Sequence, residues 1–297
     1  MIVCSPSSTH IDILVVPYRE KVVFSITPET KPENRLLVDF YNAHLATTWI
    51  SHKTTATVIG AVSGIQPEDN HVRLIVPIKS KQIWGYWVEQ DGNALTIRIN
   101  RPPTIAAPPD SPVKGLTFGL EAGHGGRGLG AVGVMGTNEK TINLTSVEYL
   151  TKILEERGAG VVLMRPGDSS PLFSKRMQYA YDADADFIIS MHANAAGTAG
   201  GFLRISGTST YYKYDFCYSP ANLVYDELLK LEWGEFGVVG NFNYYPLRQT
   251  RVPSILVEQA FMSNPYDEAR LLDTEYQQAQ AEAIIRGIEQ FLDGVRE

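Results

Sequence analysis

Hydrophobic and polar positions follow two different patterns along the chain. From residue 11 to about residue 101, short runs of Val, Ile, Leu and aromatic residues alternate with turn-forming polar segments. This pattern predicts β-strands and no long helix. The predicted strands are residues 11–18, 21–27, 34–41, 55–62, 71–78, 86–90 and 94–100. Together they predict a small all-β domain of the sandwich type over residues 1–105.

A proline-rich segment follows this half of the chain. The stretch "RPPTIAAPPDSPVKG", residues 101–115, contains five prolines. Proline stiffens an extended backbone, so we expect a linker at about residues 101–114 and a domain boundary there.

After the linker, strand-like and helix-like patterns alternate. The predicted strands are residues 115–123, 159–166, 185–194, 207–213 and 253–261, and the predicted helices are 138–158, 170–184, 219–233 and one or two more from Asn264 onward. We expect Gly158 to end the first of these helices and Ser219 to cap the third. Strands that alternate with helices predict an α/β domain over residues 115–297, built on a mainly parallel sheet flanked by helices.

Composition narrows the class of protein. Hydrophobic residues make up 44% of the 297 residues and charged residues 20%, which is typical of a soluble globular protein. The formal net charge of −7 argues against nucleic acid as the main partner, because no basic surplus is available to neutralise phosphates. No apolar run reaches the ~20 residues that span a bilayer, and no export signal is visible, so we expect a chain that does not span a membrane. The two cysteines, Cys4 and Cys217, exclude a cysteine-rich zinc site.

Four polar side chains lie at or just beyond the ends of predicted strands, where α/β folds bind ligands. They are His124, Glu139, His192 and Glu258. Two histidines and one carboxylate can hold a catalytic zinc ion, and a second carboxylate can take a proton from its water. Taken singly, each residue has a simpler interpretation, as a hydrogen-bonded histidine, a first-turn acid or a member of a salt bridge.

The stretch "EAGHGGRGLGAVGVMGTNEKT", residues 121–141, surrounds His124 with glycines. Glycine adopts backbone angles closed to other residues and allows close approach of other groups. We therefore expect a sharp turn after a strand, which points His124 into a cleft.

Several ordered motifs resemble one enzyme family. The segments "EAGHGG…GAVGVMGTNEK", "VVLMRPGDSSPLFSKR", "ADFIISMHANA" and "VPSILVEQAFMSN" resemble the zinc-dependent N-acetylmuramoyl-L-alanine amidases of bacterial cell walls, over roughly residues 115–294. The resemblance implies one Zn²⁺ per chain, held by His124, Glu139 and His192, with Glu258 as the catalytic carboxylate. It implies a peptidoglycan hydrolase that cuts the amide bond between N-acetylmuramic acid and L-alanine, in the periplasm or cell envelope.

The chain departs from the family pattern at a few positions. Glu121 and Ala122 stand where Asp-Pro is frequent, Gly128 where Asp is frequent, and Ala260 where Gly is usual. None of these changes removes an expected ligand. We expect Glu121 to be structural, with compensation for Gly128 in support of the metal loop as the alternative.

Other residues have weaker indications. Arg248 is a candidate for binding a stem-peptide carboxylate, and Asn194 for contacting substrate or fixing a loop. We expect Arg165, Asp168 and Arg176 to brace a loop and a helix away from the chemistry. The segment of residues 195–207 is too short for a substantial blocking helix, which predicts an open site that needs no activator.

The first half also resembles the AMIN module that precedes many such amidases. The likeness rests on "ENRLLVDFYNAHL" and "VRLIVPIKSKQIWGYWVEQDGNALTIRI". It implies targeting to the envelope through peptidoglycan, or through envelope or division proteins. Trp84, Tyr86 and Trp87 are candidates for stacking on sugars, although aromatic residues in strands usually pack in a core.

Two other functions remain open at this point. The chain can be a non-catalytic, amidase-like module that binds peptidoglycan, or a zinc peptidase that acts on stem peptides. The sequence contains no HExxH motif, which argues against the common zincin type of peptidase.

Overall fold

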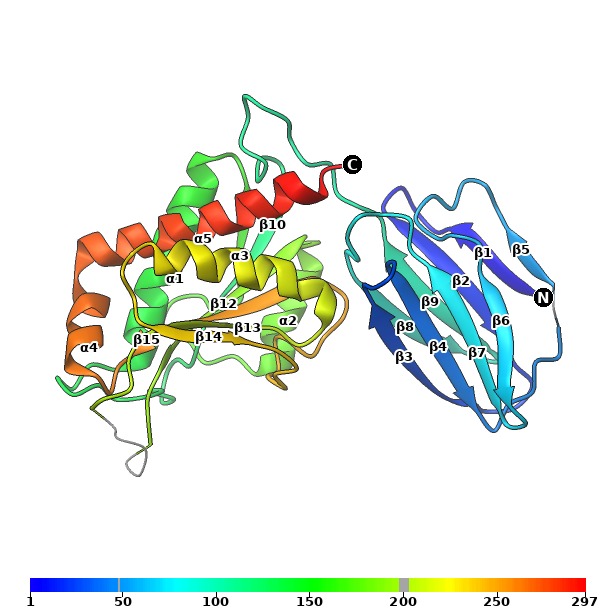
Figure 1. Cartoon of the computed structure of the whole chain (residues 1–297), viewed down its shortest axis with the longest axis horizontal. Coiled ribbons are helices and arrows are strands. Elements are labelled where there is room, and N and C mark those ends of the chain that lie inside the picture. The colour runs from blue at the N-terminus through cyan, green and yellow to red at the C-terminus, as the bar shows by residue number, and fades with distance from the viewer. Residues whose placement is uncertain (48, 198–202) are drawn as a thin grey trace. The chain divides into compact units, whose positions relative to one another are not determined.

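The structure is a computed structural model that describes residues 1–47, 49–197 and 203–297. The described chain forms two compact units (Figure 1). One unit comprises Met1–Pro103 with Thr250–Pro253 and Glu297, and the other comprises Thr104–Gln249 with Ser254–Arg296.

The N-terminal region is all-β, as predicted, and consists of two sheets. The five-stranded sheet has the order β5-β1-β2-β9-β8 and the four-stranded sheet the order β3-β4-β7-β6. The strands are β1 (Ile2–Pro6), β2 (Ile11–Pro17), β3 (Val23–Glu29), β4 (Arg35–Tyr41), β5 (Ile50–His52), β6 (Ser63–Glu68), β7 (His71–Pro77), β8 (Tyr86–Asp91) and β9 (Ala94–Asn100). Buried and less buried residues alternate along β2, β7 and β9, because one face of each strand lies in the core.

The prediction of a strand at residues 55–62 is wrong. This segment makes a single bridge, between Ile59 and Ile78, and the strand β6 begins only at Ser63. The backbone N–H of Val58 donates to the buried Asp12 carboxylate at 2.8 Å, and the N–H of Gly60 donates to the Pro77 carbonyl at 2.7 Å. These donors are therefore taken up outside a regular ladder, and apolar character alone misled the prediction.

Two of the three aromatic residues proposed to stack on sugars belong to the interior. Trp84 and Tyr86 are each 3% exposed. The third, Trp87, is half-buried, and the Arg251 guanidinium lies 4.6 Å from its ring centre. Trp84 and Tyr86 therefore offer no open ring face to a sugar.

The second unit has the predicted α/β fold with a mainly parallel sheet. The strand order is β11-β10-β12-β15-β13-β14, and every pair is parallel except β13 with β15. The strands are β10 (Thr117–Ala122), β11 (Gly160–Leu163), β12 (Phe187–Asn194), β13 (Thr208–Tyr211), β14 (Glu235–Val239) and β15 (Ser254–Phe261). The sequence pattern did not predict β14, a partly exposed edge strand interrupted by Gly237, nor the short strands β1 and β5.

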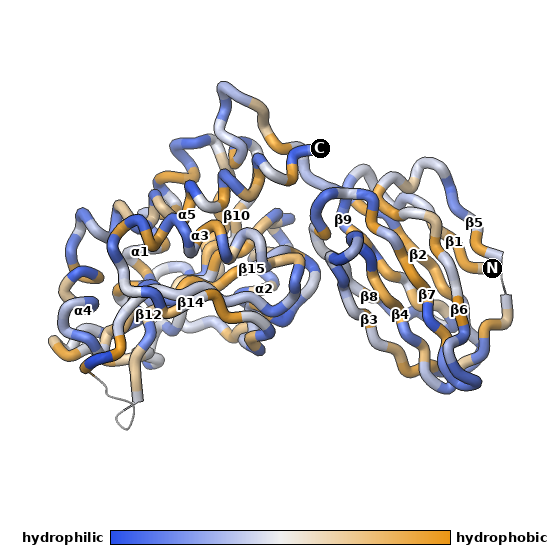
Figure 2. Tube along the Cα trace, in the orientation of Figure 1, coloured by the Kyte–Doolittle hydropathy of each residue, from blue (hydrophilic) through white to orange (hydrophobic). Residues whose placement is uncertain are grey.

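Helices flank this sheet. They are α1 (Glu139–Glu156), α2 (Phe173–Asp182), α3 (Tyr218–Leu229), α4 (Pro265–Leu272) and α5 (Thr274–Val295). Helix α1 packs on β10 and β12 and also on α5, which in turn packs on α3. Apolar residues run through the strands of both units (Figure 2). Among the described helices, none combines the length and the apolar character needed to cross a membrane.

Helix ends were predicted with mixed success. Gly158 has φ +82°, a left-handed conformation suited to glycine, and follows the end of α1 as expected. Ser219 is not the N-cap of α3. That helix begins at Tyr218, because a short 3₁₀ turn over Asp215–Cys217 runs directly into it and places Cys217 at the cap.

Candidate metal centre

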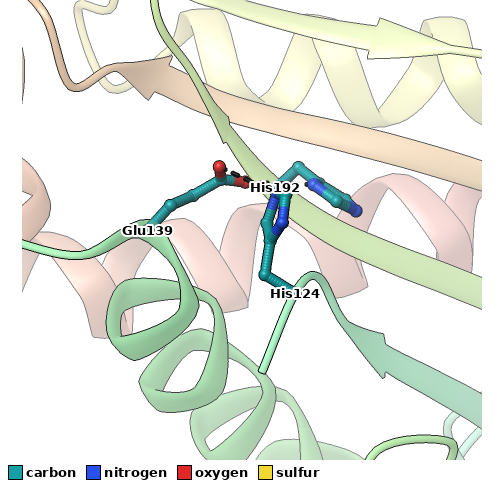
Figure 3. Close-up of side chains that lie close together, drawn as sticks. All are labelled: His124, Glu139 and His192. Carbon is teal, nitrogen blue, oxygen red and sulfur yellow. Dashed lines mark hydrogen bonds and ion pairs between the residues drawn. The ribbon is translucent and has the colours of Figure 1, made fainter. Parts of the chain in front are cut away.

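Three of the predicted site residues meet at the carboxyl end of the parallel strands (Figure 3). His124 lies in the loop after β10, Glu139 is the first residue of α1, and His192 lies in β12. His124 Nε2 lies 2.9 Å from Glu139 Oε2, and His192 Nδ1 lies 3.0 Å from Glu139 Oε1. One potential ligand atom from each residue lies within 4.8 Å of the other two, which is close enough for a single metal ion.

Glycines make this convergence possible. A Cβ atom on Gly123 would lie 2.3 Å from the His192 ring, and one on Gly130 would lie 2.5 Å from a Glu139 carboxylate oxygen. His124 itself has φ +64°, which is uncommon for a residue other than glycine. The loop therefore turns as sharply as the sequence predicted, and small residues leave room for the three side chains.

The Glu139 carboxylate is held by donors from three segments. It accepts hydrogen bonds from the backbone N–H of Ala131 at 2.9 Å and of Ala193 at 3.1 Å, and from Asn143 Nδ2 at 3.1 Å. Gln259 on β15 donates to Asn143 Oδ1 and to the His192 carbonyl, each at 3.1 Å. These bonds fix the carboxylate between the two histidines.

Glu121, near the end of β10, is fully buried beside His192. Ser190 and Arg176 both donate to its carboxylate, and its Oε2 lies 3.6 Å from His192 Nε2. The expectation that Arg176 lies away from the chemistry is wrong. Its guanidinium also donates to the His124 carbonyl at 2.6 Å, because α2 packs against β10 and brings the side chain under the loop.

Glu258 faces His192 from the neighbouring strand. The two residues are paired in the parallel register of β12 and β15, so their side chains project from the same face of the sheet. The Glu258 Oε2 atom is buried and has no hydrogen-bond partner among the described residues. Burial raises the pKa of Glu258 to about 7, against the opposing attraction of His192.

Carboxylates outnumber cations around this cluster. Burial would lower the pKa of His192, but the nearby carboxylates of Glu121 and Glu139 outweigh it and raise that pKa to about 10. Burial likewise opposes ionisation of Glu139, yet its bonds to His124 and His192 hold its pKa well below the usual range. Two imidazoles and a carboxylate are the ligand set of catalytic zinc sites. The donor chemistry and the excess negative charge thus suit a divalent cation such as zinc.

The remaining predicted residues lie around this centre. Asn194 closes β12, and its amide donates to the Tyr211 hydroxyl at 3.4 Å. Arg248 is exposed, with its guanidinium 4.6 Å from the centre of the Tyr245 ring. The ring of Phe173 stacks on Tyr245 and meets Tyr244 edge-on, so ring contacts lead from Arg248 toward His192.

A salt bridge braces the glycine-rich loop from outside. Lys140 Nζ donates to the Gly126 carbonyl at 2.8 Å and to Asp168 at 2.7 Å. The fully buried Arg165 donates to the Lys140 carbonyl at 3.0 Å. Part of the segment expected to leave the site open, residues 198–202, lies outside the described residues.

Sequence reasoning missed some residues of this site. Asn143 follows Glu139 by four residues, a helical spacing that could have identified it. The Tyr244 hydroxyl lies 3.0 Å from His192 Nε2. Neither Tyr244 nor Gln259 was indicated by a local sequence pattern. Only the fold brings these two to the centre.

Comparison with known proteins agrees with this geometry. Residues 119–290 match the family described as N-acetylmuramoyl-L-alanine amidase, and this range covers more than half of the chain. The chain belongs to this family.

Several relatives resemble the amidase in sequence. The uncharacterised protein YqiI of Bacillus subtilis is 35% identical over 187 residues, which are 61% of this chain and 87% of YqiI. The probable cell wall amidase LytH of Staphylococcus epidermidis is 30% identical over 218 residues, covering 70% of this chain and 72% of LytH. The match to the N-acetylmuramoyl-L-alanine amidase LytC of Bacillus subtilis, also 30% identical, covers only 36% of LytC.

Solved structures resemble the amidase over the same region. The N-acetylmuramoyl-L-alanine amidase AmiC2 of Nostoc punctiforme is 33% identical with a TM-score of 0.56, covering 60% of this chain and 97% of AmiC2. The catalytic domain of CwlV from Paenibacillus polymyxa is 30% identical with a TM-score of 0.55, covering 60% of this chain and 98% of that domain.

Zinc binding should release a proton from His192. With its pKa raised to about 10, the metal-free ring is protonated at about pH 8, whereas an ordinary histidine is neutral there. A metal ligand must be neutral, so the apparent affinity should rise about tenfold per pH unit between about pH 7 and pH 9. Calorimetry in two buffers with different ionisation heats measures the protons released. An affinity that does not change over this range would contradict the raised pKa.

Gly123→Ala should weaken zinc binding by about tenfold or more, because the added methyl group must displace the His192 ring. Gly128→Ala is the matched control, since its Cβ would meet only the Gly125 carbonyl, at 3.3 Å. Competition with a chromogenic chelator gives both affinities. Equal affinities for the two variants would show that the ring does not need this space.

Proposed function

We propose that the chain is a zinc-dependent N-acetylmuramoyl-L-alanine amidase, which hydrolyses the amide bond between the lactyl group of N-acetylmuramic acid and L-alanine of the stem peptide. One observation carries the proposal: two histidines and Glu139 form a possible ligand set, and Glu258 pairs with His192 on the neighbouring strand. The buried Oε2 of Glu258 has no hydrogen-bond partner among the described residues. The family and its cell-wall relatives support peptidoglycan amidase activity.

His124, Glu139 and His192 would hold the zinc ion. When bound, zinc activates a water molecule and polarises the scissile carbonyl. The chain's own contribution is to present three ligand atoms and to leave a further position for water and substrate, as catalytic sites do.

Glu258 would act as the general base and then as the general acid. It accepts the proton of the attacking water at a carboxylate oxygen that has no other partner in the described part of the chain. It then gives this proton to the nitrogen of the departing L-alanine. A pKa raised toward neutrality suits both steps, because the same group must gain and lose a proton near pH 7.

Arg248 and Asn194 would contact the stem peptide. Arg248 lines an open pocket of about 370 Å³. The other lining residues are Ser174, Met177, Tyr181, Tyr245 and Gln249. A guanidinium group in such a pocket suits a peptide carboxylate, which it can bind through two parallel hydrogen bonds. Asn194 ends the strand that carries His192, and this position supports its proposed contact with substrate.

The N-terminal all-β unit would direct the enzyme to peptidoglycan in the cell envelope. Its sequence resembles an AMIN module, and we propose that it targets the amidase to the cell envelope, through peptidoglycan or through envelope or division proteins. The cell-wall relatives support an envelope location. Tethering the catalytic unit to a second binding unit would raise its effective concentration at the wall.

Glu258→Gln should retain one zinc per chain and lower turnover of peptidoglycan by at least about 100-fold, because it removes the proton acceptor but not a ligand. Elemental analysis gives the metal content, and mass spectrometry of the digest identifies the bond that is cut. A free lactyl carboxylate with free L-alanine amino termini indicates the amidase, whereas shortened stem peptides indicate a peptidase. Turnover at the wild-type rate would disprove the role of Glu258.

Arg248→Ala should raise KM by about 10-fold for substrates with free stem-peptide carboxylates, with kcat little changed, because a charge-assisted hydrogen bond is lost. Arg248→Lys should recover only part of the loss, since an ammonium group cannot form the paired bonds. A substrate whose carboxylates are amidated is the control, and the variants should treat it like the wild type. An equal KM rise for both substrates would assign Arg248 to local structure instead.

A further inference from the structure

The two ring nitrogens of His192 have different surroundings. Nδ1 faces Glu139, within the proposed metal centre, at 3.0 Å. Nε2 faces away from that centre, toward the Tyr244 hydroxyl at 3.0 Å and the Glu121 carboxylate at 3.6 Å. A neutral histidine carries its proton on only one of these nitrogens, and the partner of the other nitrogen decides which one.

Only one tautomer of His192 is compatible with metal binding at Nδ1. The proton must then lie on Nε2, so that Nδ1 offers its lone pair. Tyr244 does not select this tautomer, because a hydroxyl group can either donate to Nε2 or accept from it. An ionised carboxylate can only accept, so Glu139 favours a proton on Nδ1 while no metal is bound. Once a metal takes the place of that proton, Glu121 is the carboxylate that favours the remaining proton on Nε2.

The surroundings of Glu121 keep it ionised and fixed in place. The residue is 0% exposed, the Arg176 guanidinium pairs with Oε1, and the Ser190 hydroxyl donates to Oε2. Arg176 is in turn tied to the Ala122 carbonyl at 3.1 Å and to the His124 carbonyl. A glutamate has one methylene group more than the aspartate frequent in this family, and here it reaches Arg176, Ser190 and the vicinity of His192 together.

We propose that Glu121 is a positioning residue, whose carboxylate stabilises the His192 tautomer that binds the metal through Nδ1. The inference rests on the proposed function in one respect, since it takes zinc as the occupant of the centre. It differs from the expectation that Glu121 is merely structural. Such outer carboxylates typically change metal affinity by 10- to 100-fold when they are removed.

Glu121→Gln tests this role in the full-length protein. The amide keeps the shape of the side chain but loses the charge. With its oxygen toward Arg176, it places its NH₂ group where Oε2 faced Ser190 and Nε2. We expect the zinc affinity of the variant, measured by chelator competition from about pH 7 to pH 9 and corrected for protonation of His192, to fall by about 10- to 100-fold. In zinc-loaded, ¹⁵N-labelled protein, the NMR signal of the His192 Nε2 proton should shift upfield or disappear through faster exchange with water.

Two further variants separate positioning from stability. Glu227→Gln removes the charge of another buried glutamate, which lies on α3 and pairs with Lys230 and Arg286. It should lower the melting temperature without changing zinc affinity. Tyr244→Phe removes the hydroxyl near Nε2 and should weaken zinc binding less than Glu121→Gln does.

The possible results are distinct. Unchanged zinc affinity and an unchanged Nε2 proton signal in Glu121→Gln would overturn the proposal, even if the variant melts earlier. A larger loss in Tyr244→Phe than in Glu121→Gln would also overturn it and assign the role to Tyr244. If the wild type itself binds no zinc, the proposed function fails before any variant is compared. If zinc binds but no amide is cut, the proposed function fails, whereas the zinc affinities still decide the role of Glu121.

Discussion

The Glu139 carboxylate is the group on which the whole centre depends. Its two oxygens meet histidines from segments that lie 68 positions apart in the sequence, His124 and His192. A buried carboxylate needs such partners, and backbone N–H groups supply the rest of its hydrogen bonds. Because α1 begins at Glu139, the start of this helix fixes the point at which the loop after β10 and the strand β12 converge.

This convergence explains why the sequence around His124 is so rich in glycine. Any side chain at Gly123 would overlap the His192 ring, and any at Gly130 would overlap Glu139. The parallel register of β12 and β15 adds Glu258 without a further loop, since a paired residue projects from the same face. The three proposed ligands and the proposed proton acceptor therefore come from one loop, one helix start and two neighbouring strands.

The sequence predicted features that local pattern determines. Alternating strands and helices identified the α/β sheet, and three of the predicted site residues, His124, Glu139 and His192, lie together as a possible metal site. The short strand β5 and the edge strand β14 lack a clear pattern and were missed. So was the contact of Arg176 with Glu121, because packing of α2 on β10 creates it and no spacing encodes it. Ordered motifs, through the family resemblance, thus indicate the candidate ligands, whereas the residues that orient them depend on packing.

Charge balance gives a reason to regard this cluster as functional rather than stabilising. Glu121, Glu139 and Glu258 crowd around His192, and Arg176 bonds directly to only the first of these carboxylates. Burying such a group of charges costs stability, and apolar residues of similar volume would pack at least as well. Protons can compensate part of the charge, as the raised pKa values of His192 and Glu258 show, and a divalent cation compensates it without them. Three acids around one buried histidine therefore suit the cation and the proton transfer that we propose better than they suit a purely stabilising role.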